Sequence, residues 1–193
     1  MNNFKQLTIS EMVFITILSV ILGIFWWAYT FFYDIVSPIF KASGLDGGLT
    51  GIWLIGGVFF PYIIRKPGSA ILGEGIAAII EGVISQWGIS AILYGAIQGL
   101  PLELLFILLG YKKFDMKTMC LAGLISGIFS CLMSIYLYQY YKLGLTYCLI
   151  QLASSGISGI VLAGILSKVL ADKLAKTGAL NQFNIVRIQR NTN

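Results

Sequence analysis

The stretch MVFITILSVILGIFWWAYTFFY, residues 12–33, contains 22 residues and no charged side chain. An α-helix needs about 20 mostly apolar residues to cross the roughly 30 Å of hydrocarbon in a bilayer. A secretory signal peptide is the competing interpretation. The stretch is too long for a signal-peptide core, Glu11 precedes it, and no A-x-A cleavage site follows it. Residues 12–33 therefore predict a transmembrane helix.

The composition extends this conclusion to the whole chain. Of the 193 residues, 58% are hydrophobic and 11% are charged. Soluble domains are roughly 45–50% apolar and about 25% charged, so an ordinary soluble domain and a disordered chain are both excluded. The sequence contains no histidine and no Walker A pattern, and no dense basic cluster alternates with aromatics. These absences argue against imidazole-based catalysis or metal binding, a nucleotide site, and nucleic-acid binding.

Six apolar runs lie along the chain. They cover residues 12–33, 49–64, 69–84, 89–109, 119–137 and 145–170. The second and third are joined by Arg65-Lys66-Pro67-Gly68, a turn signal that makes them a helical pair. We therefore predict an all-α membrane protein, a single integral domain over residues 1–193 with six transmembrane helices.

The basic residues predict which side of the membrane each loop faces. With the N-terminus inside, 11 of the 13 lysines and arginines fall on the inner side and only Lys41 and Lys142 on the outer side. Cytoplasmic loops carry such an excess of basic residues. We expect a multi-pass cell-membrane protein with both termini in the cytoplasm, a solvated tail over residues 171–193, and many of the ring side chains at residues 26–33 and 136–141 as interface anchors.

Carboxylates inside the membrane are candidates for function, because burying a charge there is costly. Glu81 lies near the outer end of the third predicted helix, with no basic residue at its depth on a neighbouring helix. Glu74 and Glu103 lie nearer the cytoplasm. Either could bind ligand, or serve as an interhelical hydrogen-bond partner or reach toward Arg65 or Lys66.

Four further residues lie with Glu81 in the outer half of the predicted bundle. The candidate binding residues are Glu81, Gln98, Trp53, Tyr94 and Trp87, with Glu103 as a deeper member. Two alternatives stay open: Trp53 and Tyr94 as interface anchors, and Gln98 as an amide that joins helices. We also expect the glycine-containing segment 34–49 to be a flexible outer lid.

Small residues predict close helix contacts. Ser19 and Gly23 form a small-xxx-small pair on the first helix, which lets another helix approach closely. We expect this pair to be the surface that contacts a partner protein.

Several short motifs follow one another along the chain: GIW at 51–53, YIIRKPGSA at 62–70, Glu74 and Glu81, GAIQGL at 95–100, ELLF at 103–106, ISG at 157–159, AG at 163–164 and LAKTGALN at 174–181. In this order they resemble the YkoE family. The resemblance covers most of the chain from about residue 50. The sequence departs from the family pattern at Ser134 and Ser155, where members often carry an acid and an arginine.

The resemblance implies a transport function. Members of this family are S components, the substrate-binding subunits of energy-coupling factor (ECF) transporters for hydroxymethylpyrimidine (HMP) and thiamine. It also implies a vitamin site open to the outside, and a transmembrane coupling subunit and two ATPases as partners. From the residues themselves, with no histidine and no metal-ligand cluster, we expect no cofactor and no metal. An enzyme is not expected, since no nucleophile lies beside a base.

For such a ligand, Gln98 would pair with an aminopyrimidine edge and Glu81 would accept from its amine or face a positive ring. The aromatic side chains would stack on the ring. The alternative function is a small stand-alone secondary transporter or cation exporter that couples to protons through a membrane glutamate.

Overall fold

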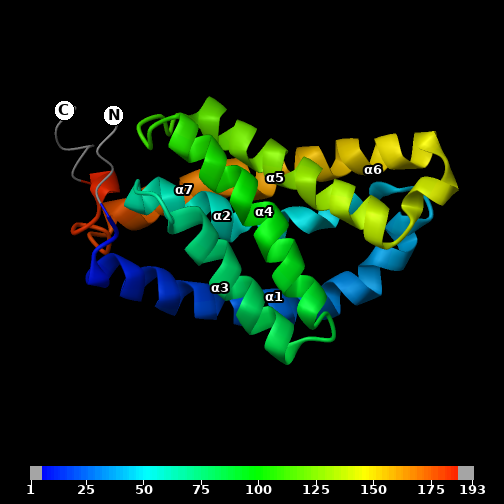
Figure 1. Cartoon of the computed structure of the whole chain (residues 1–193), viewed down its shortest axis with the longest axis horizontal. Coiled ribbons are helices and arrows are strands. Elements are labelled where there is room, and N and C mark those ends of the chain that lie inside the picture. The colour runs from blue at the N-terminus through cyan, green and yellow to red at the C-terminus, as the bar shows by residue number, and fades with distance from the viewer. Residues whose placement is uncertain (1–5, 187–193) are drawn as a thin grey trace.

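The computed structural model describes residues 6–186, and this part of the chain is helical with no strand. Its elements are α1 (Ile9–Lys41), the 3₁₀ helix η1 (Leu45–Leu54), α2 (Ile55–Ile64), α3 (Ser69–Ile84), α4 (Ile89–Leu108), α5 (Met116–Leu137), the 3₁₀ helix η2 (Tyr140–Leu143), α6 (Leu145–Ser158), the π-helix η3 (Gly159–Ile165) and α7 (Leu166–Lys176). Most of the helices run roughly along the long axis of the molecule (Figure 1).

The first helix begins at a capping box and is longer than its apolar run. The Thr8 side chain accepts from the backbone N–H of Glu11, while the Glu11 carboxylate accepts from that of Thr8. Lys66, on the α2–α3 turn, adds an ion pair to Glu11 at 2.6 Å. The helix then continues to Lys41, well beyond residue 33.

The expected outer lid is therefore wrong. Between the end of α1 at Lys41 and the start of η1 at Leu45, only residues 42–44 remain as a turn. Asp46, in the first turn of η1, is 3% exposed. Residues expected to be mobile at the surface are instead part of the packed helical bundle.

Within residues 6–186, five helical segments are long and apolar enough to cross a membrane. They are Ile9–Lys41, Leu45–Ile64, Ile89–Leu108, Met116–Leu137 and Leu145–Lys176. The one predicted span not among these five is the third, residues 69–84, which forms α3 with 16 residues. At 1.5 Å per residue it covers about 24 Å, less than the roughly 30 Å of hydrocarbon. The all-helical membrane fold is confirmed, and the count of six crossings stays a prediction.

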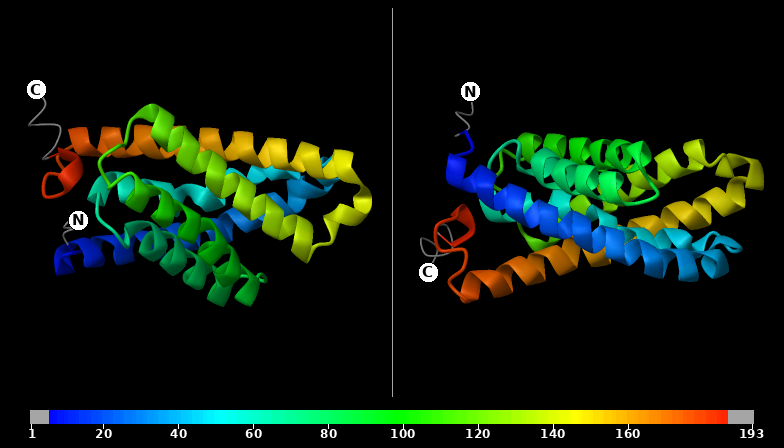
Figure 2. Two further views of the ribbon diagram at one scale, coloured as in Figure 1. Left: turned by 45° about the horizontal axis from the view of Figure 1, so that its top comes forward. Right: turned by 90° about the horizontal axis from the view of Figure 1, so that it is seen from below.

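The turns between the helices lie at two opposite ends of the molecule, and each end has its own set of turns. The start of α1, the α2–α3 turn, the α4–α5 turn and the end of α7 all lie at the left in Figure 1. The turns after α1 and after α5 lie at the right, and the views in Figure 2 agree. Strongly basic turns thus share one end, as the charge count predicts, although Lys5, Arg187 and Arg190 of that count lie outside the described residues.

The polar segment after residue 170 differs from the predicted solvated tail. Helix α7 continues to Lys176, and the chain then folds back onto the bundle. Leu180, Phe183 and Ile185 are at most 2% exposed and join the main apolar core. Their burial explains why this segment is ordered despite its charges. Residues 187–193 of the predicted tail lie outside the described range.

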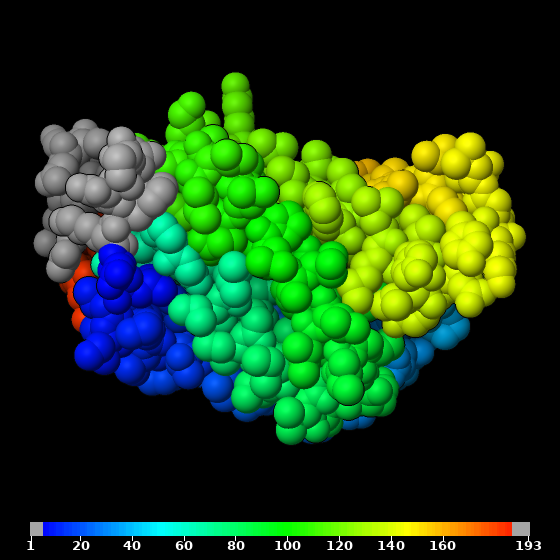
Figure 3. All heavy atoms as spheres, viewed as in Figure 1, coloured from blue at the N-terminus to red at the C-terminus, as the bar shows by residue number. Residues whose placement is uncertain are grey.

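Helix α2 lies at the centre of the bundle. Nine of its residues are buried, because other helices surround it on every side. A helix that is apolar all round fits such a position. Atoms of α3, α4 and α5, teal to yellow-green, cover much of the face seen in Figure 3.

Candidate functional site

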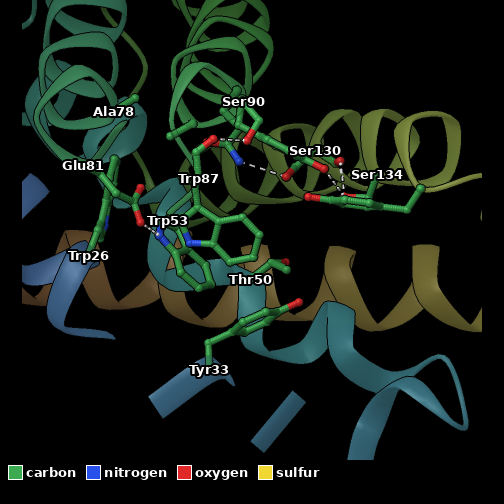
Figure 4. A pocket seen from close by; sticks show the side chains of 14 residues that line it. Trp26, Tyr33, Thr50, Trp53, Ala78, Glu81, Trp87, Ser90, Ser130 and Ser134 are labelled. Carbon is green, nitrogen blue, oxygen red and sulfur yellow. Dashed lines mark hydrogen bonds between the residues drawn. The ribbon is translucent and has the colours of Figure 1, made fainter. Parts of the chain in front are cut away.

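A cavity of about 90 Å³ lies between η1, the outer ends of α1, α3 and α5, and the outer half of α4 (Figure 4). It is large enough for several water molecules or one small flat ring. The residues that line it are Trp26, Tyr33, Thr50, Trp53, Ala78, Glu81, Trp87, Ser90, Ala91, Tyr94, Gln98, Ser130, Ser134 and Tyr138. Five of the six predicted binding residues are among them, and only Glu103 is not.

Glu81 is held from one side and free on the other. Its Oε1 accepts from the indole Nε1 of Trp53 at 2.7 Å and lies 3.3 Å from the Thr30 hydroxyl. Its Oε2 accepts no hydrogen bond from residues 6–186, although the residue is only 3% exposed. This oxygen is therefore free to accept a hydrogen bond from a donor in the cavity that Glu81 lines.

Aromatic rings form the walls around Glu81. The ring of Tyr33 lies edge-on to Trp53, with centroids 5.1 Å apart, and 6.2 Å from the ring of Trp87. The Trp87 indole N–H donates to the Thr30 hydroxyl at 3.2 Å, which fixes its orientation. Such rings offer flat apolar surfaces that attract cations as well as other rings.

The Tyr33 hydroxyl makes no hydrogen bond to any residue of the described part of the chain. Figure 4 shows its oxygen directed along the cavity toward Thr50. A phenol can both donate and accept. Tyr33 therefore supplies a second free polar group, in addition to the Glu81 oxygen.

Gln98 borders the cavity, but its amide is already used. In the orientation that satisfies both ends, its nitrogen lies 2.9 Å from Glu74 Oε1 and 3.3 Å from the Trp53 carbonyl oxygen. Its oxygen accepts from the Ser130 hydroxyl at 2.9 Å. The amide edge that we expected to pair with a ligand thus joins three helical elements instead. Gln98 therefore helps to hold the wall of the cavity in place, and its side-chain oxygen keeps one lone pair that can still accept a hydrogen bond.

The two deeper carboxylates satisfy the starts of neighbouring helices. Glu74, fully buried, accepts from the backbone N–H of Gly57 in the first turn of α2 at 2.6 Å. Glu103 accepts from the N–H groups of Gly68 at 2.7 Å and Ala70 at 3.1 Å, at the start of α3. Neither helix has a side-chain cap of its own.

These bonds correct the assignment of Glu103 to the ligand. The first N–H groups of a helix lack partners within the helix, and the helix dipole favours a negative group there. Glu103 also accepts from the Tyr111 hydroxyl at 2.6 Å. Its carboxylate is thus occupied and lies outside the cavity, so its position in the fold is structural.

Ser19 and Gly23 face the interior of the protein, which contradicts their prediction as a partner surface. Ser19 is fully buried. A Cβ at Gly23 would lie 2.5 Å from the Ala77 carbonyl oxygen and 2.8 Å from Ile80 Cβ, both on α3. The small pair does allow a close helix approach, as expected, but the approaching helix is α3 of the same chain.

Several lining residues were not identified from the sequence. Trp26 and Tyr33 were counted among the interface aromatics, but both are buried. With Thr30 they follow a spacing of four and three residues on α1, which places all three on one helical face. This spacing could have identified the three residues from the sequence. Ser130 and Ser134, which lie four residues apart on α5, follow the same helical spacing.

The departures from the family pattern lie close to the cavity. Ser134 is 2.7 Å from the Tyr94 hydroxyl, and Ser155 donates to the Gly127 carbonyl at 2.9 Å. Within residues 6–186 no group of three Asp, Glu, Cys or His residues could hold a metal ion.

Comparisons with known proteins agree on membrane transport. Residues 10–129 match a family described as the permease component of an ABC-type cobalt transport system. The chain is 33% identical over 178 residues to a Bacillus subtilis (strain 168) protein that carries the name HMP/thiamine permease protein YkoE, covering 92% of this chain and 89% of that one. A crystal structure of an S component of an ECF transporter superposes with a TM-score of 0.90 at 30% identity, covering 97% of this chain and 95% of that one.

Proposed function

Because this chain belongs to the YkoE family of ECF-transporter S components, we propose that its aromatic cavity binds an aminopyrimidine compound of the HMP and thiamine class. The relative's name supplies that ligand class, and the cavity offers the chemistry to recognise it. The family is a transporter family, so the chain is a multi-pass membrane protein and not an enzyme.

The free Oε2 of Glu81 is the observation that carries the proposal. An aminopyrimidine presents an exocyclic amine donor beside a ring-nitrogen acceptor. The amine would donate to Glu81, and the Tyr33 hydroxyl would donate to a ring nitrogen. In a site of low dielectric, the same carboxylate would attract a positively charged ligand more strongly than it does in water.

The aromatic walls supply the rest of the affinity. Trp53 and Trp87 reach the cavity from two separate elements, and their indole N–H groups are already bonded to Glu81 and Thr30. Their faces are therefore held in place before a ligand arrives. A preorganised site of this kind loses less entropy when it binds.

The partners follow from the same family. We propose that the loaded subunit delivers its ligand through a transmembrane coupling subunit driven by two ATPases, since this sequence has no Walker A motif of its own. A cobalt substrate, suggested by the family description, fits the cavity poorly, because Glu81 is the one carboxylate among its 14 lining residues and six of the others are aromatic. The stand-alone secondary transporter is not favoured by the comparisons.

The test is calorimetric titration of the purified chain in detergent with HMP and with thiamine. Glu81→Gln keeps an acceptor for Trp53 but turns the free oxygen into an amide nitrogen that donates. Losing a hydrogen bond to a charged group is worth roughly 1.5–3 kcal/mol, so we expect affinity to fall about ten- to a hundredfold.

Glu103→Gln is the matched control, because it makes the same chemical change outside the cavity. We expect it to bind both compounds like the parent. If Glu81→Gln also binds like the parent, or if the parent binds neither compound, the proposed function is wrong.

A further inference from the structure

The turn between α2 and α3 contains an arginine in a backbone conformation that arginine rarely adopts. Arg65 ends α2 with φ 57° and ψ 43°, which is the left-handed region. Its N–H donates to the Pro61 carbonyl at 2.9 Å, and the Asn184 amide donates to the Ile64 carbonyl at 2.7 Å, so the end of the helix is held in this form. Glycine is the usual residue at such a helix end. An arginine at a position that favours glycine indicates a function for its side chain.

The guanidinium of Arg65 is held against two aromatic rings. Its central carbon lies 5.4 Å from the centre of the Tyr62 ring and 5.0 Å from that of Phe114, which belongs to the α4–α5 turn. Its Nε donates to the Tyr62 carbonyl oxygen at 3.2 Å. The two terminal nitrogens donate to no residue of the described range 6–186. Four N–H groups of a planar fork are therefore oriented and available to an acceptor.

The positive charge of Arg65 also lacks an acid of its own. Asp172 on α7 interacts with Arg65 electrostatically but forms no ion pair with it. The Asp172 carboxylate instead accepts from the Tyr62 hydroxyl at 2.5 Å and from the Lys168 ammonium at 2.8 Å. Lys168 lies over the same Tyr62 ring, 4.6 Å from its centre. Two cations thus share one carboxylate, and the charge of Arg65 is left in excess.

The surroundings of Arg65 combine positive charge with exposed apolar side chains. The α4–α5 turn that supplies Phe114 lies at the same end of the molecule as the α2–α3 turn (Figure 1). Three exposed lysines lie on or next to that turn: Lys112, Lys113 and Lys117. Leu108, at the end of α4, is 76% exposed, and Met116, at the start of α5, is 40% exposed. A ligand with an anionic head and an apolar tail fits this combination.

We infer that Arg65 binds the phosphate of an anionic phospholipid in the leaflet on the cytoplasmic side of the predicted topology. The guanidinium fork donates two hydrogen bonds to the phosphate oxygens, a pairing that its planar geometry matches. The neighbouring lysines add attraction to the headgroup, and the acyl chains lie along the exposed ends of α4 and α5. Basic pockets between membrane helices on the cytoplasmic side bind such headgroups. This site is separate from the aromatic cavity, which lies at the outer ends of α1, α3 and α5.

The experiment is native mass spectrometry of the purified full chain in detergent, titrated with phosphatidylglycerol or with phosphatidylcholine. We expect the parent to bind the anionic lipid about tenfold or more tightly than the zwitterionic one, because charged hydrogen bonds to the phosphate are not offset by a headgroup cation. Arg65→Gly removes the guanidinium and suits the positive φ, so the fold should persist while the preference falls to within about twofold. Arg65→Lys keeps the charge without the fork and should retain part of the preference.

Lys173→Gln is the matched control, because it removes an exposed positive charge from the last turn of α7 at the same end of the molecule. We expect it to keep the preference of the parent. If Arg65→Gly does not fold, Arg65→Asn takes its place, since asparagine also tolerates the left-handed region.

The outcomes separate a lipid from other anions. Loss of the preference in Arg65→Gly but not in Lys173→Gln supports the site. A parent without preference, an Arg65→Gly variant that binds like the parent, or equal losses in both variants overturns it. Displacement of the lipid by excess inorganic phosphate would also overturn it, in favour of a free anion. Loss of a co-purified coupling subunit in Arg65→Gly with lipid preference unchanged would instead assign Arg65 to a carboxylate of that partner.

Discussion

The contact between α1 and α3 predicts that Gly23→Ala destabilises the fold. The added Cβ would lie 2.5 Å from the Ala77 carbonyl oxygen and 2.8 Å from Ile80 Cβ. Ordinary contacts begin near 3.4 Å, so α1 must move away from α3 by about 1 Å or bend. Overpacking of this kind typically costs about 1–3 kcal/mol.

A matched control separates this packing effect from helix propensity. Gly75 lies on α3, and a Cβ there would meet nothing within 4 Å. Gly75→Ala therefore shares the propensity gain of alanine over glycine, up to about 1 kcal/mol, without the clash. The difference in the free energy of unfolding between the two variants isolates the packing effect.

Thermal unfolding in detergent, followed by tryptophan fluorescence, measures that difference. For a chain of this size about 1 kcal/mol corresponds to roughly 2–4 °C, so Gly23→Ala should melt about 2–12 °C below Gly75→Ala. Ligand affinity should fall too, because separating the helices moves Thr30 on α1 away from Glu81 on α3. Equal melting temperatures would refute the close approach. Equal melting with failed assembly onto a coupling subunit would restore Gly23 as a partner surface.

Three further changes test other parts of the argument. Glu103→Gln should lower the free energy of unfolding by about 1–3 kcal/mol, measured by thermal unfolding, because it weakens the charged cap on α3; an unchanged melting temperature would contradict that role. Tyr33→Phe should weaken ligand binding about two- to tenfold in titration while leaving the melting temperature near that of the parent, and unchanged affinity would remove the hydroxyl from the site. In a background without native cysteines, Lys142→Cys should react with an impermeant reagent on whole cells and Lys113→Cys should not; the reverse pattern would invert the predicted topology.

The sequence alone determined the class of the protein and the depth of its polar groups. An uncharged apolar run of 22 residues is long enough to span a bilayer as a helix, so the helical membrane fold follows from residues such as 12–33 without any tertiary information. The third predicted helix, 69–84, agrees with α3 at both ends, because Pro67-Gly68 and Ser85 interrupt the pattern there. The depth of Glu81 in the outer half follows from the same pattern.

Some boundaries could not be read in this way. Helix α1 extends to Lys41, and Leu180, Phe183 and Ile185 pack into the core although they stand between polar residues in a short segment outside the long apolar runs. Hydropathy reports how much apolar surface a segment has, whereas burial depends on which neighbouring surface it meets. Ser19 and Gly23 illustrate the same limit, because a row of small residues predicts a close helix contact without saying which helix makes it.

The tertiary structure decided which carboxylate remains available for a ligand. Glu74, Glu81 and Glu103 are alike in sequence, each an acid within an apolar helix. Only the packing places Glu74 at the start of α2 and Glu103 at the start of α3, where unpaired backbone N–H groups satisfy them. Glu81 lies near the end of its own helix and receives bonds at one oxygen only. Its other oxygen is left for the cavity, since hydrogen-bond partners that come from distant segments are set by the fold and not by local sequence.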